Sequence, residues 1–468
     1  MNQQKLFLIA VAAIVSVLVG AIASPTAMDV IYLGLAAGAM VSPLQSYRCM
    51  SLAVILKYLN PELAVLGPNS AILFWVVLTA GSCRLLLLVR PANLAIVAPL
   101  WAFCLIAFML SCVSSPVLPV SILKVITLMI VATAVICGFQ AIPLSALNKL
   151  KVWMFALGTS VAVMSAMTIA RPAVAYSLVK TSLQGILNHP QTLGTFLAPF
   201  AAWALCGMLT TRHRPKIIEL AFLVSIWAVM LMTLARTAAI AAVTGVGVAF
   251  CFRFISGRRT ADQAGIGKML GLSAAALLVL IVSLITAAAV RTSVTSFILK
   301  RDAQNLDQSF YSSRGGGIES QWNNFLQKPL TGHGFGVYAD GSFPDGVVEF
   351  KGIPISAPVE KGFIPTAILE ETGIIGASIF WLFIFKIGTN VFRSSDLRWI
   401  AVFSAAVMVN VGEAVLLSPG GIGLHIWIMI AFAAAAHRLN KPHSDQEVLE
   451  SSPALVAMPH RHYPNLLR

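Results

Sequence analysis

Charged residues are scarce in this sequence: they make up 11% of the 468 residues, against about 25% in soluble domains. This scarcity excludes an ordinary soluble fold, because a domain in water needs a charged and polar surface. Hydrophobic residues account for 58% of the chain, and the mean hydropathy is +0.85. The chain therefore reads as a polytopic membrane protein.

Cysteine is also sparse and unpatterned. The seven cysteines lie in or beside apolar runs, and none lies within 292–361. Because no Cys-x-x-Cys or Cys/His spacing occurs, we expect neither a disulfide framework nor a metal site, and no cofactor is indicated. No repeat of fixed period is present, which disfavours a transporter built from inverted repeats.

The basic residues are distributed as membrane topology requires. The formal net charge is +14, but Lys and Arg lie mainly at the ends of apolar runs, which favours membrane lipid over nucleic acid as a partner. The most basic connections, 212–216, 253–259, 393–398 and 437–441, are separated by pairs of spans. By the positive-inside rule we expect all four, and the C-terminus, on the cytoplasmic side.

A span needs about 20 apolar residues, and this length predicts an all-α protein with about 12–14 membrane helices. The expected spans are 6–23, 27–44, 69–89, 93–113, 119–139, 152–170, 190–210, 217–235, 237–255, 269–290, 362–386, 398–417 and 421–437. Residues 49–67 are ambiguous, because they read as either a broken span or an interfacial segment. The expected organisation is membrane helices in 1–291, a large periplasmic loop in 292–361, further membrane helices in 362–439 and a disordered cytoplasmic tail in 440–468.

The polar loop is the first place to look for chemistry. Apolar residues recur at helical spacing over 318–328, which predicts a surface helix with Trp322 and Phe325 lying on the membrane domain. A glycine-rich turn follows around His333. Its glycines permit positive φ, and its N–H groups are a weak candidate for binding phosphate.

Three polar residues in the helical part are also candidates. Arg236 opens a span after a minimal turn, as either an interfacial anchor or a ligand for an anionic headgroup, and Arg291, Arg301 and Arg314 are expected on the same face. Glu413 is a carboxylate in an apolar run, and it is either a functional residue or the partner in a structural hydrogen bond. His189 enters a span and is either a satisfied turn histidine or a site residue. Glu371 is expected near the start of the span that follows the polar loop, where its negative charge stabilises the helix N-terminus.

Several motifs, in order, resemble those of the O-antigen ligase and Wzy-type polysaccharide polymerase family of bacterial membrane proteins. They are Asn188-His189-Pro190 entering a span, Leu234-Ala235-Arg236-Thr237 opening another, Arg314 to Trp322 and Pro329 to Gly336 in the outer loop, and Leu369-Glu370-Glu371-Thr372-Gly373 at the return to the bilayer. The resemblance covers roughly residues 50–440.

The resemblance implies an inner-membrane glycosyltransferase that acts at the periplasmic face on glycans linked to undecaprenyl pyrophosphate. It implies Arg236 and Arg314 as pyrophosphate ligands, and a chain-length regulator or export machinery as partners. The family's ligases place a His-Asn pair about eleven residues before Glu-x-Gly, where this chain has Gly362-Phe363. Glu360 is the nearest alternative base and His333 the second.

The missing histidine shifts the expectation from a lipid A core ligase to a polymerase that joins repeat units of exopolysaccharide or O-antigen. A ligase and a non-enzymatic transporter of lipid-linked glycans remain the alternatives. Sequence leaves the sugar repeat unit, the acceptor and the linkage stereochemistry open.

Overall fold

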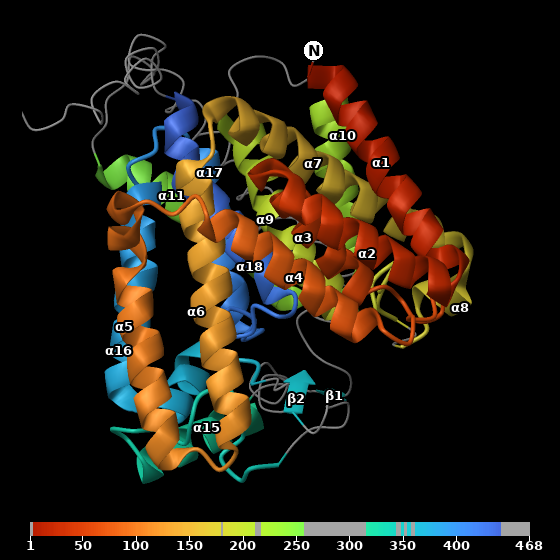
Figure 1. Ribbon diagram of the computed structural model, residues 1–468. Coiled ribbons are helices and arrows are strands. Elements are labelled where there is room, and N and C mark those ends of the chain that lie inside the picture. Colours follow the sequence, from red (N-terminus) through yellow and green to blue (C-terminus); the bar gives the residue numbers. More distant parts are fainter. Residues whose placement is uncertain are drawn as a thin grey trace, which may run out of the picture.

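The computed structural model describes residues 3–178, 181–210, 217–256, 315–342, 348–350, 353–356 and 361–440. Within these ranges the protein is a helical bundle with one small β-hairpin (Figure 1). The span expected at 269–290 and the tail beyond residue 440 lie outside the described residues. The all-α expectation for a polytopic membrane protein is confirmed.

The described elements fall into three groups by length and hydropathy. Seven are long and apolar enough to cross a bilayer: α1 (Gln3–Ala23), α5 (Pro91–Ser114), α6 (Leu118–Ala141), α7 (Leu144–Met167), α9 (Pro190–Thr210), α11 (Arg236–Ile255) and α16 (Ile364–Val391). Shorter apolar helices are α2 (Pro25–Val41), α4 (Ser70–Leu86), α10 (Ile217–Met232), α17 (Leu397–Met408) and α18 (Gly423–Ala435). The remaining elements are α3 (Pro43–Lys57), η1 (Thr168–Ala170), α8 (Pro172–Ala175), α15 (Gly316–Gln327), β1 (Val348–Phe350), β2 (Ile353–Ser356), η3 (Val409–Val411) and η4 (Ala436–Asn440).

Local sequence explains where several helices start. Pro25, Pro43 and Pro91 occupy first-turn positions, where a missing N–H costs nothing. Ser24 and Ser42 precede two of them, and each hydroxyl accepts a hydrogen bond from a backbone N–H of the first turn. α2 and α3 are therefore separate helices, joined by a single cap residue.

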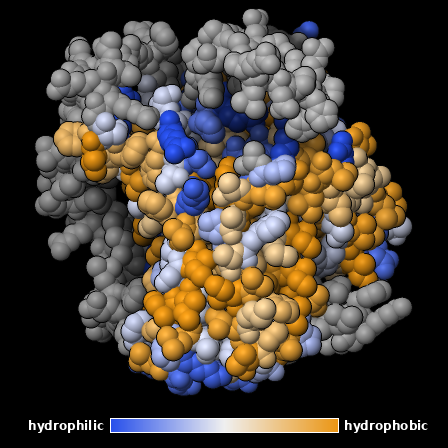
Figure 2. Space-filling view, turned by 60° about the vertical axis from the view of Figure 1, so that its left-hand side comes forward, coloured by the Kyte–Doolittle hydropathy of each residue, from blue (hydrophilic) through white to orange (hydrophobic). Residues whose placement is uncertain are grey.

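The core lies around α18. Every residue of α18 is buried, and the helix packs against α6, α16 and α17. α3, which contains the first part of the ambiguous segment 49–67, is also buried over most of its length. This part of the segment therefore packs among other helices and does not face lipid. Apolar side chains cover the middle of the face shown in Figure 2, with hydrophilic ones gathered near its upper and lower edges. This distribution suits a protein embedded in lipid.

One expected span ends early. Residues 398–417 were expected to form one helix, but α17 ends at Met408 and is followed by η3 and an irregular loop. Asn410 explains the break: its buried side chain donates to the Ala406 carbonyl and accepts from the N–H of Leu416. Glu413 therefore lies in a loop rather than inside a helix.

Candidate functional site

A cavity of about 550 Å³ lies where several connections of the bundle meet. Its wall takes residues from the end of α3, from α4 and α6, from the start of α9, from Gly362 and from the 413–423 loop. These segments are far apart in sequence. We call this space the polar cavity.

Four of the lining residues carry ionisable groups other than a phenol: Lys57, Lys124, His189 and Glu413. Asn188, Gln191 and several hydroxyl side chains, among them Thr192 and Ser418, complete the polar part of the wall. If His189 is neutral, the two lysines and the one carboxylate give the lining a net positive charge. The described lining therefore favours a ligand that carries negative charge and many hydroxyl groups.

The wall beside His189 is fixed by pairing between two connections. Leu59 and Leu187 form an isolated β-bridge, and the N–H of Asn188 donates to the Tyr58 carbonyl at 2.7 Å. The Nδ1 atom of His189 accepts from the N–H of Gln191 at 3.1 Å, so the neutral ring carries its proton on Nε2. His189 is thus a satisfied turn residue that also faces the polar cavity.

The 413–423 loop forms another part of the wall, and its glycines are required by close packing. A Cβ on Gly420 would overlap the Trp75 ring, and one on Gly421 would overlap the Tyr58 hydroxyl. The Tyr58 hydroxyl accepts from the N–H of Ile422. The backbone of this loop is therefore packed directly against Trp75 and Tyr58, which also line the polar cavity.

Arg236 opens α11 after a tight turn, as expected, and the structure shows that this turn is strained. Leu234 has a φ of 52°, the only positive value at a non-glycine residue in the described structure. Added Cβ atoms show the packing around this turn: one on Gly194 would overlap Ala235, and one on Gly412 would overlap Thr237. The start of α11 therefore lies beside the segments that bring Thr195 and Glu413 into the cavity wall.

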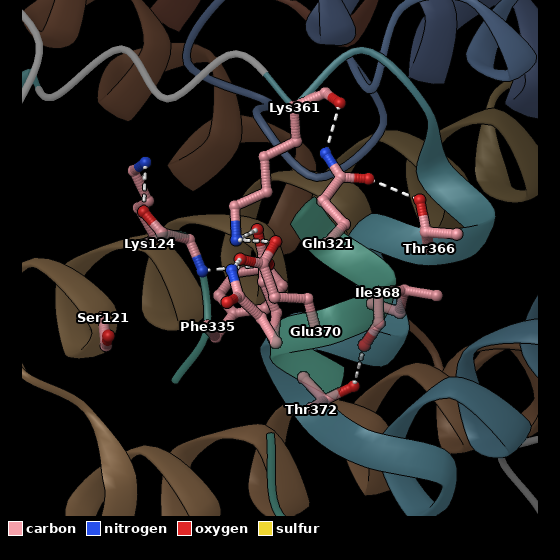
Figure 3. A network of polar contacts seen from close by, with 12 residues as sticks. Ser121, Lys124, Gln321, Phe335, Lys361, Thr366, Ile368, Glu370 and Thr372 are labelled. Carbon is pink, nitrogen blue, oxygen red and sulfur yellow. Dashed lines mark hydrogen bonds and ion pairs between the residues drawn. The ribbon is translucent and has the colours of Figure 1, made fainter. Parts of the chain in front are cut away.

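A buried ionic cluster, next in sequence to the cavity residue Gly362, joins Lys361 to α16 (Figure 3). The Lys361 Nζ atom is 2.8 Å from Glu370 Oε2 and 3.4 Å from Glu371 Oε1. All three side chains are 3% exposed. We call these three residues the Lys361 cluster. Glu371 therefore forms an ion pair within α16, seven residues after the start of that helix at Ile364, so it does not serve that start. It lies two residues before Gly373, whose φ of 60° interrupts α16.

Polar side chains of α15 extend the Lys361 cluster. Asn324 donates to Glu370 Oε1 at 2.8 Å, and Gln321 bonds the Lys361 carbonyl and the Thr366 hydroxyl (Figure 3). The buried side of α15 is thus polar, whereas Trp322 is 45% exposed and Leu326 57% exposed. The expectation that Trp322 lies on the membrane domain is wrong, because the buried charges need hydrogen-bonding partners that only the polar face provides.

The glycine-rich turn inserts between α5, α6 and α16. Gly332, Gly334 and Gly336 all have positive φ, and a Cβ on any of them would overlap a neighbouring segment. The turn's N–H groups bond within the protein: Gly334 to the Glu371 carbonyl, Phe335 to the Ser111 hydroxyl and Gly336 to Glu371 Oε2. These donors are occupied, so this turn is not available as the phosphate cradle considered from sequence.

His333 belongs to this turn and not to the polar cavity. His333 is 6% exposed, and its ring Nε2 atom lies 2.9 Å from the Asn324 carbonyl oxygen. Its backbone N–H donates to the Glu370 carbonyl. It is absent from the cavity lining. The geometry gives it a role in holding the turn.

The structure brings together some of the expected site residues and omits others. His189 and Glu413 share the polar cavity, and the packing contacts above put Arg236 beside it. Glu360, Arg291, Arg301 and Arg314 lie outside the described residues. Among the described residues no group of His, Cys, Asp and Glu is arranged to hold a metal.

Sequence reasoning missed Lys57 and Lys124 as cavity residues. Each is a single lysine at the end of an apolar run, the usual pattern of an interfacial anchor. One signal was present: Lys124 lies within the expected span 119–139, where a cation needs a partner. Its Nζ atom donates to the Gly336 carbonyl at 2.6 Å, a contact between residues far apart in sequence.

Comparison with known proteins adds no family to this description. No protein-family model matches the sequence, and none of the curated proteins matches it.

Proposed function

We propose that the chain is a membrane glycosyltransferase that joins glycan repeat units carried on undecaprenyl pyrophosphate, as Wzy-type polymerases do. The observation that carries this proposal is the polar cavity, with two lysines, a histidine and a carboxylate among membrane helices. A lipid-linked glycan combines pyrophosphate, hydroxyl groups and a hydrocarbon chain. A cationic, hydroxyl-rich cavity inside a membrane protein suits all three features.

The reaction needs two things from the protein. A base must remove the proton from an acceptor hydroxyl, whose oxygen then attacks the anomeric carbon of the donor sugar. As that bond forms, the bond from the anomeric carbon to the pyrophosphate oxygen breaks, and the lipid pyrophosphate leaves with the electron pair. Cations near the leaving oxygen stabilise its charge.

Arg236 is the proposed ligand of the leaving pyrophosphate. It combines a guanidinium with the N-terminus of α11, and both features attract an anion. Arg314 is proposed to join it, with Arg291 and Arg301 as further cations of the loop. This pairing of helix start and arginine supports the role of anion ligand over that of an interfacial anchor.

Glu360 remains the proposed general base, because it precedes by two residues the Gly362 that lines the polar cavity. Glu413 is the carboxylate within the described lining and is the second candidate. His189 is proposed as a further residue of the site, because it lines the polar cavity and its ring is oriented by the hydrogen bond that Nδ1 accepts from the N–H of Gln191.

The proposed location is the bacterial inner membrane, with the C-terminus in the cytoplasm and the polar cavity opening toward the periplasm. The basic connections support this orientation by the positive-inside rule. A chain-length regulator and export machinery are proposed partners.

Deleting the chain from its native host tests the proposal. A polymerase predicts loss of long polymer while single repeat units still reach their lipid carrier or acceptor. The measurement is gel analysis of lipopolysaccharide and secreted polysaccharide, together with mass spectrometry of the lipid-linked pool.

Other outcomes of the deletion would contradict the polymerase. Loss of all glycan from the lipid A core, with long lipid-linked polymer still formed, assigns a ligase. Single units trapped on the cytoplasmic side assign a transporter. Unchanged glycans in both fractions reject all three.

A further inference from the structure

A second hollow, also of about 550 Å³, lies between α4 and α6. Its lining is almost wholly apolar: Ile72, Trp75, Val76, Thr79, Ala80, Leu123 and Thr127. Ile72 is 37% and Val76 43% exposed, on a surface that a bilayer would cover. We call this hollow the α4–α6 groove.

The groove adjoins the polar cavity. Trp75, Leu123 and Thr127 line both spaces. Figure 1 shows α4 and α6 running at an angle to one another with α18 behind them. We call the two adjoining spaces together the recess; its polar-cavity part is lined by charged residues and its groove part is apolar. A ligand that fills such a recess is an amphiphile with an anionic head.

Lys57 is placed to hold that head. Its Nζ atom donates to the Gly420 carbonyl at 2.6 Å and lies 4.4 Å from the centre of the Phe74 ring. The described part of the chain offers it no carboxylate within salt-bridge distance. An ammonium has three donors and is costly to bury without a counter-charge, so an anionic ligand would complete its coordination.

Lys124 approaches the same space from α6. It lines the polar cavity while its Nζ atom is held by the Gly336 carbonyl. Its helix neighbours Leu123 and Thr127 line both the polar cavity and the α4–α6 groove. One stretch of α6, residues 123–127, would therefore contact both the anionic head and the hydrocarbon chain of such an amphiphile.

We propose that this recess binds the lipid carrier, with its phosphate groups against Lys57 and Lys124 and its isoprenoid chain along the α4–α6 groove. A single groove between two helices suits one hydrocarbon chain better than the paired chains of a phospholipid. The choice of undecaprenyl pyrophosphate rests on the proposed function. The positions of head and chain rest on the recess itself.

Binding of undecaprenyl pyrophosphate without its glycan tests the inference, using the purified full chain in detergent and native mass spectrometry or fluorescence titration. Lys57→Met is expected to weaken binding by about tenfold or more, and Lys57→Arg to retain most of it. Val76→Phe, which fills the groove, is expected to weaken binding of the lipid but not of inorganic pyrophosphate.

Matched controls separate these effects from general damage. Lys386→Met removes an exposed lysine of α16, and Val243→Phe enlarges a valine that is 54% exposed on α11; both are expected to bind as the unmodified chain does. Size-exclusion profiles establish that each variant is folded.

Several results would overturn the inference. They are no binding of the lipid to the unmodified chain, unchanged binding by Lys57→Met, equal effects of Val76→Phe and Val243→Phe, or inorganic pyrophosphate binding as tightly as the lipid. Because turnover is not measured, lipid binding without polymer formation would count against the proposed function and leave the recess assignment intact.

Discussion

Lys361→Met is expected to destabilise the protein by about 3–5 kcal/mol, because it leaves two buried carboxylates without their cation. Glu370 and Glu371 are each 3% exposed and lie within 3.4 Å of the Lys361 ammonium. The junction between the loop and α16 should open. The measurement is the thermal unfolding midpoint in detergent, together with the yield of monodisperse protein.

Lys328→Met provides the matched control, because Lys328 is an exposed lysine just after α15. It should leave the midpoint nearly unchanged. Combining Lys361→Met with Glu370→Gln and Glu371→Gln should recover part of the loss, since the uncompensated charges are then gone. A midpoint for Lys361→Met equal to that of Lys328→Met would contradict the role given to the Lys361 cluster.

Arg236→Ala is expected to reduce polymer formation by about 100-fold or more, the usual effect of removing one donor that stabilises a leaving or oxyanionic oxygen. Arg236→Lys should retain part of the activity, because it keeps the charge but not the bidentate geometry. The measurement is polymer length and quantity in a deletion strain that expresses each variant, with protein levels equalised by immunoblot.

Arg253→Ala is the control for this experiment, because Arg253 lies in the last turn of the same helix. It should support normal polymer formation. Arg314→Ala is expected to fail as Arg236→Ala does, since both are proposed to hold the pyrophosphate. Normal polymer from both variants would remove the arginines from the mechanism.

The helices were largely predictable because the sequence marks them directly. Apolar runs of membrane length predicted α1, α5, α6, α9 and α16 to within five residues at each end. α3 was ambiguous because its burial among other helices, rather than its own composition, stabilises it. The early end of α17 depends on two hydrogen bonds of the Asn410 side chain, which cannot be inferred from the pattern of apolar residues.

The candidate site was less predictable, because its residues meet only through tertiary packing. His189, Glu413 and Arg236 stood out as polar residues at span ends. Lys57 is joined to the 413–423 loop by the Gly420 carbonyl, a contact between opposite ends of the chain. The Lys361 cluster has the same character, since its buried polar partners come from α15 and the glycine-rich turn.

The most direct test of the central claim is reconstitution. The purified chain in liposomes, supplied only with repeat units on undecaprenyl pyrophosphate, is predicted to produce a ladder of products spaced by one repeat unit, with one lipid pyrophosphate released per bond formed. Folded protein that binds the substrate but leaves every repeat unit single would contradict the account.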